Sequence, residues 1–510
     1  PASMLTGALP AISGASLTNL PAGGAVDFVA SGTLPNGSKV VLKANGQVEV
    51  VAITTAAVAA DIPAGTAVAV QNTSTFIQKT EISFDPNTSG KFVLGYQNVG
   101  DGEGYVIVGT VSGTSLSFGT AVGFNNQDVD YINVHYEPNT ANKLLITFKD
   151  LGNNNYAKAM IGTVSGTSIS LNTTEYVINS GNTHYLQTSV DPNTTGKFVS
   201  VYRDSGTSNL GFAIIGTISG TSISVSSESV FEGSATTYPR VAYDISTANK
   251  FLVTSTASDG KTYARVGTIS GSSVSYGTRT EILSYSLNNH YDMKCNPNVA
   301  GQFILIVQNS SVGKAYVLTV SGTNVSISTA YTFSSGQEPS DNRVSFDPNT
   351  AGAFAITYRG ASNYQYVQSG TQSGSTITFL TPEAVTSAYS NNLAINFDPS
   401  TALKFVCVSS ESNNSFRGKA VVGTIGKSPV FNLTSTNFLG TSTAAYTNGQ
   451  TATIMLQGGV SGNQSSLAIG STYYVQIDGT LATSADSNSG APSVVAGKAV
   501  SATTLLLKGI

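Results

Sequence analysis

The sequence predicts an all-β fold, a seven-bladed β-propeller with an N-terminal β-hairpin segment and a small C-terminal β domain. Three observations predict it: a turn motif recurs seven times, a second motif follows it at the same spacing, and each repeat contains four short strand-like segments. No segment has the 3.6-residue period of an amphipathic helix. We therefore expect almost no helix.

The first motif is a D-P-N-T-x-G turn between two strands. Its Asp accepts backbone hydrogen bonds, its Pro presets φ at the second turn position, and its Gly supplies a positive φ. Successive copies are separated by 51 to 54 residues and begin at Phe84, Tyr136, Val190, Tyr243, Cys295, Phe346 and Phe397.

The second motif, G-T-V-S-G-T-S, links the last two strands of each repeat. Two independent motifs that keep one period identify tandem repeats. In the second repeat the strands are YINVHYE, KLLITFK, KAMIGTVS and SISLNTTEYVI. Such sheets bury their faces when they pack around an axis as propeller blades. The alternative is an open array or a fibrous β-solenoid, whose coils have shorter periods and parallel pairing.

The predicted domains are an N-terminal connector and hairpin (1–64), the propeller (65–434, with repeats near 75, 127, 181, 234, 286, 337 and 388) and a C-terminal β module (435–510). Asn45-Gly46 marks the hairpin reversal. The segment GTAVAVQN at 65–72 matches GTAVGFNN at Gly119, which belongs to a fourth strand. We expect it to supply the outer strand of the last blade, a place for which the segment from Ser428 competes.

Composition excludes several classes of function. Only 10% of residues are charged and the net charge is −4, so without a basic stripe we expect no nucleic-acid partner. No apolar run of about 20 residues predicts a membrane span. His135, His184 and His290 lie on different repeats, so we expect no metal and no cofactor. Cys295 and Cys407 are expected to be unpaired and buried. We expect the protein to fold in a reducing cytosol.

The two ends of the chain carry a resemblance to known proteins. FLGTSTAAYTNGQTATIMLQGGV, GSTYYVQIDGTLAT and VVAGKAVSATTLLLKG at the C-terminal end resemble small β modules of tailed-bacteriophage virion proteins, especially tail fibres. GTLPNGSKVVLKANGQVEVV resembles a fibre-associated hairpin. The resemblance covers roughly 120 residues and implies a virion protein that is assembled in the host cytoplasm on other tail or capsid proteins as a homo-oligomer.

The loops differ between the two rims of the predicted propeller. The D-P-N-T and S-G-T turns are short and uniform, whereas the loops on the opposite rim differ in every repeat, which favours recognition there. Aromatic residues at the start of the inner strands form a candidate glycan- or receptor-binding rim, and their alternative role is packing between blades. They are Tyr131, His184, Tyr185, Tyr238, His290 and Tyr291.

Polar residues at equivalent inner-strand positions are predicted to line the central channel. They either bind an ion or a small anion, or pair with one another and with water. Those with charges are Glu81, Arg240, Asp292 and Arg343.

The predicted function is a structural protein of a phage virion, a tail fibre, spike or capsid appendage, that presents a propeller head to the host surface. The first alternative is a lectin-like propeller that binds a host cell-surface glycan. The second is a glycoside hydrolase, against which the sequence argues. Arg240 and Arg343 share one repeat position, and Arg203 and Arg359 share another, but no acid partner completes a catalytic group. We therefore expect no enzymatic activity.

Overall fold

The computed structural model describes residues 24–55, 60–70, 76–288, 290–335, 339–411, 417–426, 430–486 and 491–508. The chain divides into two compact units: the larger spans Ala60–Ile425, and the smaller combines Pro1–Ala59 with Gly426–Ile510. Strands dominate both, and a 3-10 turn at Ala361–Asn363 is the helical element in these ranges. Among the described residues there is no helix with the length and apolar character that membrane crossing requires.

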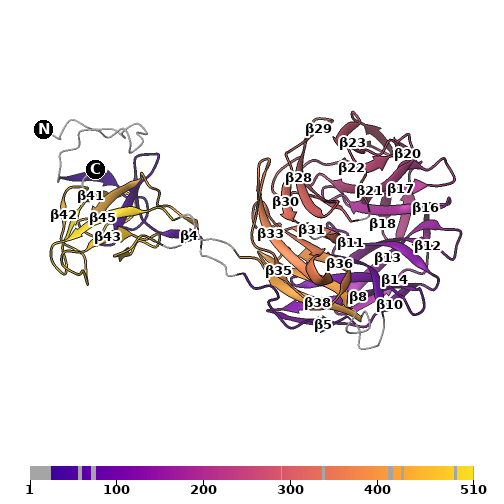
Figure 1. The fold of residues 1–510 in the computed structure, drawn as a ribbon, viewed down its shortest axis with the longest axis horizontal. Helices are drawn as coiled ribbons and strands as arrows, with labels where there is room; N and C mark the ends of the chain where they lie inside the picture. Colours follow the sequence, from indigo (N-terminus) through magenta and orange to yellow (C-terminus); the bar gives the residue numbers. More distant parts are fainter. Residues whose placement is uncertain are drawn as a thin grey trace. The chain divides into compact units, whose positions relative to one another are not determined.

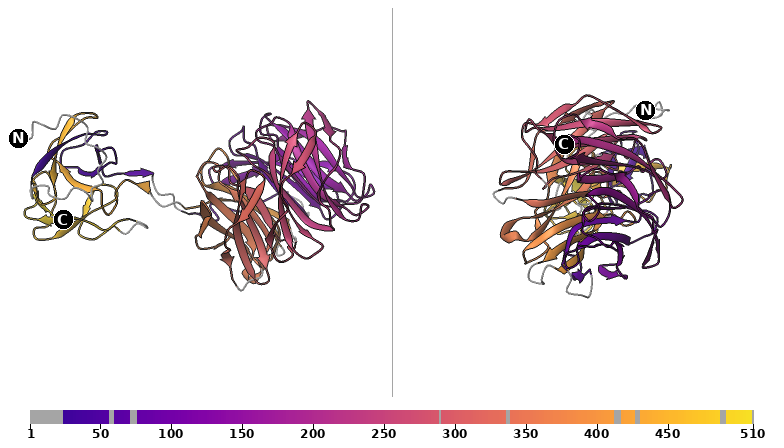
Figure 2. Two further views of the ribbon diagram at one scale, coloured as in Figure 1. Left: turned by 90° about the horizontal axis from the view of Figure 1, so that it is seen from above. Right: turned by 90° about the vertical axis from the view of Figure 1, so that its right-hand side faces the viewer.

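In its described part, the larger unit contains seven antiparallel sheets, which Figures 1 and 2 show side by side around a common centre. Their inner strands are β6 (Ile77–Phe84), β11 (Val129–Tyr136), β16 (Thr183–Val190), β21 (Thr236–Tyr243), β26 (Asp292–Cys295), β31 (Ser340–Phe346) and β36 (Ser390–Phe397). Their second strands are β7 (Lys91–Asn98), β12 (Lys143–Asp150), β17 (Lys197–Asp204), β22 (Lys250–Ala257), β27 (Gln302–Asn309), β32 (Ala353–Arg359) and β37 (Lys404–Glu411). The third strands are β8 (Gly104–Ser112), β13 (Tyr156–Ser165), β18 (Leu210–Ser219), β23 (Thr262–Ser270), β28 (Val312–Ser321), β33 (Gln365–Ser373) and β38 (Arg417–Thr424).

The outer edge of each of the first six sheets differs from the prediction, because the expected fourth strand is divided into two short strands that both pair with the third. In the second sheet the break lies at Asn172, whose side chain accepts a hydrogen bond from the Thr174 N–H and donates one to the Thr221 carbonyl. The pairs are β9 (Ser115–Phe118) and β10 (Val122–Asn125), β14 (Ser168–Leu171) and β15 (Tyr176–Asn179), β19 (Ser222–Val225) and β20 (Ser229–Glu232), β24 (Ser273–Tyr276) and β25 (Thr280–Leu283), β29 (Asn324–Ile327) and β30 (Tyr331–Ser334), and β34 (Thr376–Phe379) and β35 (Glu383–Ala384).

The two sequence motifs meet inside each sheet. Phe92, which ends the first copy of the turn motif, pairs across the strands with Gly109, which begins the second motif. A Cβ at Gly109 would lie only 2.0 Å from the Phe92 ring, so the ring occupies the space that a side chain would need. Phe92 is fully buried. The same close approach joins Phe198 to Gly216, Phe251 to Gly267, Phe354 to Gly370 and Phe405 to Gly423.

The turn motif also holds neighbouring sheets together. Within the first turn the Asn87 N–H donates to Asp85 Oδ1 at 2.9 Å, as predicted for this Asp. The Asn87 side chain donates to the carbonyl of Pro138 in the next sheet at 3.4 Å. Asn139, Asn298 and Asn349 make the equivalent bond to a proline carbonyl of the sheet that follows. The repeated turn motif therefore also forms a contact between neighbouring sheets.

The segment that precedes the first repeat pairs with the last sheet. β5 (Val68–Ala69) is antiparallel to β38, with Ala69 opposite Lys419. This is the pairing predicted for residues 65–72, of which 71 and 72 lie outside the described residues. The first and last sheets also share hydrogen bonds from the Lys79 N–H to Asn392 Oδ1 and from Lys404 Nζ to the Gly113 carbonyl.

The smaller unit contains strands from both ends of the chain, which were predicted as separate modules. Figure 2 shows the indigo and yellow strands of this unit lying together. Its first sheet has the order β1 (Ala25–Val29), β41 (Thr451–Leu456), β40 (Phe438–Ser442), β2 (Lys39–Leu42) and β3 (Val48–Val50). The second has the order β42 (Val460–Ser461), β46 (Leu505–Leu507), β45 (Val494–Ala499), β43 (Thr472–Val475) and β44 (Leu481–Ala482).

Burial explains why the two ends join. Val41 from the N-terminal hairpin and Val51 just beyond it share one apolar core with Phe438 and Val475 from the C-terminal segment. The Ser428 segment does not take the outer place of the last repeated sheet, because β39 (Val430–Phe431) pairs with β4 (Ile53–Thr55) of the smaller unit.

Candidate ligand-binding channel

Six of the inner strands in the described part of the chain contain a β-bulge near their start. One non-glycine residue at each bulge has a φ between 48° and 58°. This backbone conformation costs an L residue on the order of 1–3 kcal/mol, and a bulge re-aims the side chain it carries. The six residues are Lys79, Tyr131, Tyr185, Tyr238, Asp341 and Asn392. With His290, which holds the equivalent place in the fifth sheet, we call them the mouth ring.

One half of the mouth ring is aromatic. The Tyr185 ring lies between those of Tyr131 and Tyr238, with centroid separations of 5.8 and 4.5 Å. The Arg203 guanidinium lies 4.8 Å from the Tyr185 centroid, and Lys149 Nζ lies 5.9 Å from the Tyr131 centroid. All three tyrosines are half-buried. They form a supported aromatic arc with ring surface open to solvent.

The other half of the mouth ring is polar, and hydrogen bonds join its residues from each sheet to the next. The Asp341 N–H donates to His290 Nδ1 at 3.0 Å, and the Asn392 N–H donates to Asp341 Oδ2 at 3.3 Å. The Lys79 N–H continues the series to Asn392 Oδ1 at 3.2 Å. Each side chain is thereby oriented by the backbone of the next sheet, and Lys79 Nζ pairs with Asp130 at 3.0 Å.

The six bulged residues line one cavity of about 400 Å³. All four residues predicted to line the channel lie in its wall: Glu81, Arg240, Asp292 and Arg343. Gln187 and Lys294 lie there too.

The charges on this wall are held in different ways. Asp292 is 6% exposed, and its two oxygens accept the backbone N–H groups of Met293 and Val344 at 2.9 and 3.1 Å. Arg240 donates to the carbonyls of Tyr291 and Pro239 at 3.3 and 3.2 Å. Burial raises the pKa of Glu81, while the nearby cations, led by that of Lys294, oppose this shift.

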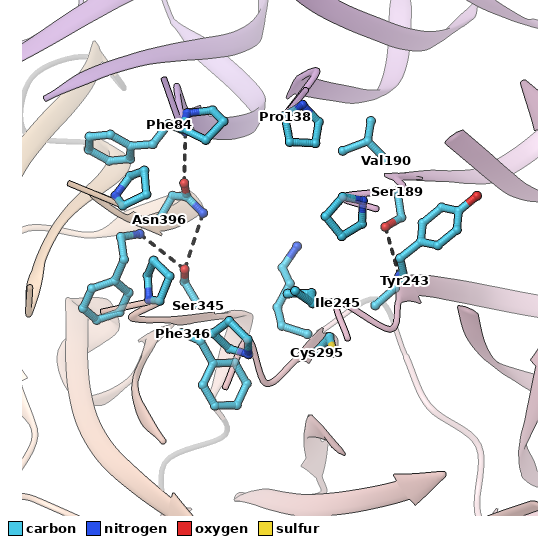
Figure 3. A pocket seen from close by; sticks show the side chains of 18 of the residues that line it. Phe84, Pro138, Ser189, Val190, Tyr243, Ile245, Cys295, Ser345, Phe346 and Asn396 are labelled. Carbon is cyan, nitrogen blue, oxygen red and sulfur yellow. Dashed lines mark hydrogen bonds between the residues drawn. The ribbon is translucent and has the colours of Figure 1, made fainter. Parts of the chain in front are cut away.

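The opposite end of the channel is apolar, and Figure 3 shows its side chains arranged around an open centre. Hydrogen bonds again join the sheets: the Tyr243 N–H donates to Ser189 Oγ at 3.2 Å, and the Phe84 N–H donates to Asn396 Oδ1 at 3.0 Å. Lys294 lines this cavity of about 330 Å³ as well as the first one, so its side chain marks where the two meet. The rim of this apolar cavity includes Pro86, Pro138, Pro192, Ile245, Pro297, Pro348 and Pro399.

The structure places the six predicted rim aromatics in different surroundings. Tyr131, Tyr185 and Tyr238 line the cavity together. His290 belongs to the polar half, and the His184 ring lies 6.0 Å from that of Tyr185 without lining the cavity. The structure corrects the prediction for Tyr291.

Tyr291 is a core residue and not a rim residue. Its side chain has no exposed surface, and its hydroxyl donates to the backbone carbonyls of Tyr238 and Thr254. The Arg240 guanidinium lies 4.9 Å from its ring. The position that follows the mouth ring is also buried in sheets with a bulge, as Ile132 and Leu186 show, so Tyr291 occupies a core position of the repeat.

Sequence reasoning missed Lys79, Asp341, Asn392 and Lys294. The first three occupy the same repeat position as Tyr131, so alignment of the seven repeats carried a signal for them. They were overlooked because only the aromatic members of that position were considered. In the described ranges no group of three or more metal-ligating side chains lies together.

Comparison with solved structures gives a fold. The chain is similar to the BP39L lectin from Burkholderia pseudomallei, with a TM-score of 0.53, 10% identity, and coverage of 70% of this chain and 100% of the lectin. It also matches Sqt1 from Chaetomium thermophilum, solved with the N-terminus of ribosomal protein L10, with a TM-score of 0.44, 8% identity, and coverage of 67% and 84%. No family model and no curated protein matches the chain. The lectin likeness, together with the repeated sheets, establishes an all-β, propeller-like fold.

Proposed function

We propose that this chain is a lectin-like propeller that binds carbohydrate at the mouth ring. The observation that carries the proposal is the arc of Tyr131, Tyr185 and Tyr238, which sits at three equivalent bulges and lines one cavity. The apolar face of a sugar ring packs on an aromatic ring, while its hydroxyls need hydrogen-bond partners. The mouth ring offers both kinds of contact.

The size and rigidity of the site support this function. A cavity of about 400 Å³ falls within the range of small-ligand sites. Tyr185 is packed between Tyr238 and Arg203, so its ring is held in place before a ligand arrives. A side chain that is already fixed loses less entropy on binding.

The proposal includes a closed ring of seven blades, with β5 completing the last one. It is supported by the pairing of Lys419 with Ala69 and by the bond from the Lys79 N–H to Asn392. Closure matters for the site because Lys79 and Asn392 belong to the first and last sheets. In an open array, Lys79 and Asn392 would lie at opposite ends, and the mouth ring would be interrupted between these two residues.

A glycan array followed by calorimetry on the best oligosaccharide tests the proposal. Replacing Tyr185→Ala or Tyr238→Ala is expected to weaken binding at least tenfold, or about 1.4 kcal/mol. Tyr185→Phe keeps the ring and should retain binding. Tyr364→Ala is the matched control, because this half-buried tyrosine does not line the cavity. Failure to bind any glycan, or equal binding by all four variants, would overturn the proposal.

A structural role in a phage virion is a second candidate. The observation that favours it is that the two segments resembling phage modules fold into one unit, into which the larger unit is inserted. This unit would attach the propeller to other virion proteins, as a homo-oligomer in the assembled particle. Mass spectrometry of purified particles should find the chain in fixed copy number, and its absence from them would remove this candidate.

A further inference from the structure

The wall of the channel below the mouth ring carries three cations on consecutive sheets. They are Arg240 on β21, Lys294 on β26 and Arg343 on β31. All three line the same cavity as the tyrosine arc. A sugar stacked on the arc would therefore reach toward them with a substituent.

These cations have few partners in the protein. Among the described residues, no carboxylate lies within ion-pair distance of any of them. Arg240 and Arg343 donate to backbone carbonyls through only part of their N–H groups, and no hydrogen bond involves Lys294 Nζ in the described structure. Charges removed from bulk water are costly unless they are paired.

The carboxylates of the wall do not complete this pairing. The two oxygens of Asp292, which lies between Arg240 and Arg343 in the order of the sheets, are already bonded to backbone N–H groups. Glu81 belongs to the first sheet and makes neither a hydrogen bond nor an ion pair within the described residues. The other two carboxylates of the wall are engaged elsewhere: Asp130 pairs with Lys79, and Asp341 Oδ2 accepts the Asn392 N–H. Counted formally, the four cations and four carboxylates that line the cavity balance, so the wall offers a ligand N–H donors that no carboxylate contacts.

From this juxtaposition we infer that the channel binds an anionic group, carried by an acidic sugar whose ring stacks on the tyrosine arc. A carboxylate or a sulfate ester supplies the acceptor oxygens that these N–H donors lack. Arginine side chains bind either group through paired N–H donors. The inference rests on the proposed function for the sugar ring and adds to it the charge of the ligand.

Calorimetry with matched oligosaccharides tests the inference. The probes are trigalacturonate and its carboxyl-reduced form, which differ only in the carboxylates, with a galactose 6-sulfate oligosaccharide as the sulfate ester. We expect the acidic probes to bind at least tenfold more tightly than the reduced one. Replacing Arg343→Gln or Lys294→Gln should abolish the difference between the acidic and reduced probes, and Arg343→Lys should restore part of it.

Arg359→Gln is the matched control, since it removes a cation from the same sheet as Arg343 without altering the cavity wall. Thermal unfolding of each variant, with and without inorganic sulfate, checks folding and occupancy of the channel independently of any sugar. Because sulfate stabilises folded proteins in general, the expected result is a larger rise in Tm for the unaltered chain than for Arg343→Gln.

Three results separate the two proposals. Equal binding of acidic and reduced probes would overturn the anionic ligand and leave the lectin-like function standing. Sulfate stabilisation that depends on Arg343, without binding of any oligosaccharide, would support an anion site and overturn the glycan function. Tight acidic binding that Arg343→Gln and Lys294→Gln leave unchanged would overturn the assignment of the group to this channel.

Discussion

The ring of Tyr185 lies 4.5 Å from the ring of Tyr238, and the two residues occupy the same bulged position on neighbouring sheets. The first prediction concerns the strain at this position. Because Tyr185 has a φ of 58°, Tyr185→Gly should be more stable than Tyr185→Ala by about 1 kcal/mol. Urea unfolding measures both. A more stable Ala variant, the usual order in a strand, would contradict the idea that the bulge is strained.

The second prediction concerns the strand that pairs with the last sheet. Val70 is 1% exposed, and its N–H donates to the Gly418 carbonyl. Val70→Ala removes two buried methyl groups and should lower the free energy of unfolding by about 1.6 kcal/mol. Val99→Ala is the control, because that side chain is 47% exposed and should change stability by less than about 0.5 kcal/mol. Equal urea midpoints for the two variants would indicate that this segment adds nothing to the larger unit.

The third prediction concerns pH. Burial lowers the pKa of His135 to about 4, and the nearby Lys294 adds to this shift. A histidine with a lowered folded-state pKa stabilises the fold above its unfolded pKa of about 6.5, and this stability is lost as the pH falls toward 4. The loss amounts to at most about 3 kcal/mol. His135→Gln should flatten the decline in urea midpoint between pH 7 and pH 4.

The carboxylates also contribute to acid sensitivity, so the difference between the two profiles is the quantity to compare. His184, whose pKa burial also lowers to about 4, will retain its share of the slope. Parallel profiles for the unaltered chain and His135→Gln would show that His135 is not held neutral.

The fourth prediction concerns the two thiols. Cys295 and Cys407 are free and buried, and burial raises the pKa of each to about 12. Neither should react with a thiol reagent at pH 8 in the folded protein, because the reactive thiolate is scarce and shielded. Both should react after denaturation. Rapid labelling of the native chain at either position would be inconsistent with this burial.

The repeat architecture could be predicted from the sequence because its determinants are local. The D-P-N-T turn and the S-G-T turn each specify their own backbone, and the seven copies differ little in spacing. The free, buried state of Cys295 and Cys407 followed from the absence of a partner at an equivalent position. Pairing of residues 65–72 with the last sheet was also predictable, since the segment matches the fourth strand beginning near Gly119.

The geometry of the candidate site and the fold of the smaller unit depend on contacts between residues far apart in the sequence, and could not be predicted from it. The bulge that aims Tyr185 toward the cavity leaves no mark in the alternation of apolar and polar residues, and Tyr291 is adjacent to a mouth-ring position but buried. Likewise, the hairpin at Asn45-Gly46 was evident, but its shared core with Phe438 and Val475 was not. The apolar faces of the two end segments are complementary only once folded.

The pairing of both chain ends also has a consequence for synthesis. β5 needs a partner strand that ends at Thr424, and β2 needs one that begins at Phe438. While the ribosome is still making the middle of the chain, both strands expose unpaired edges, which favour misassociation. These two strands therefore emerge long before the partners that cover their edges. A product cut short near its C-terminus would lose the smaller unit, and one cut before β38 would also lose the partner of β5.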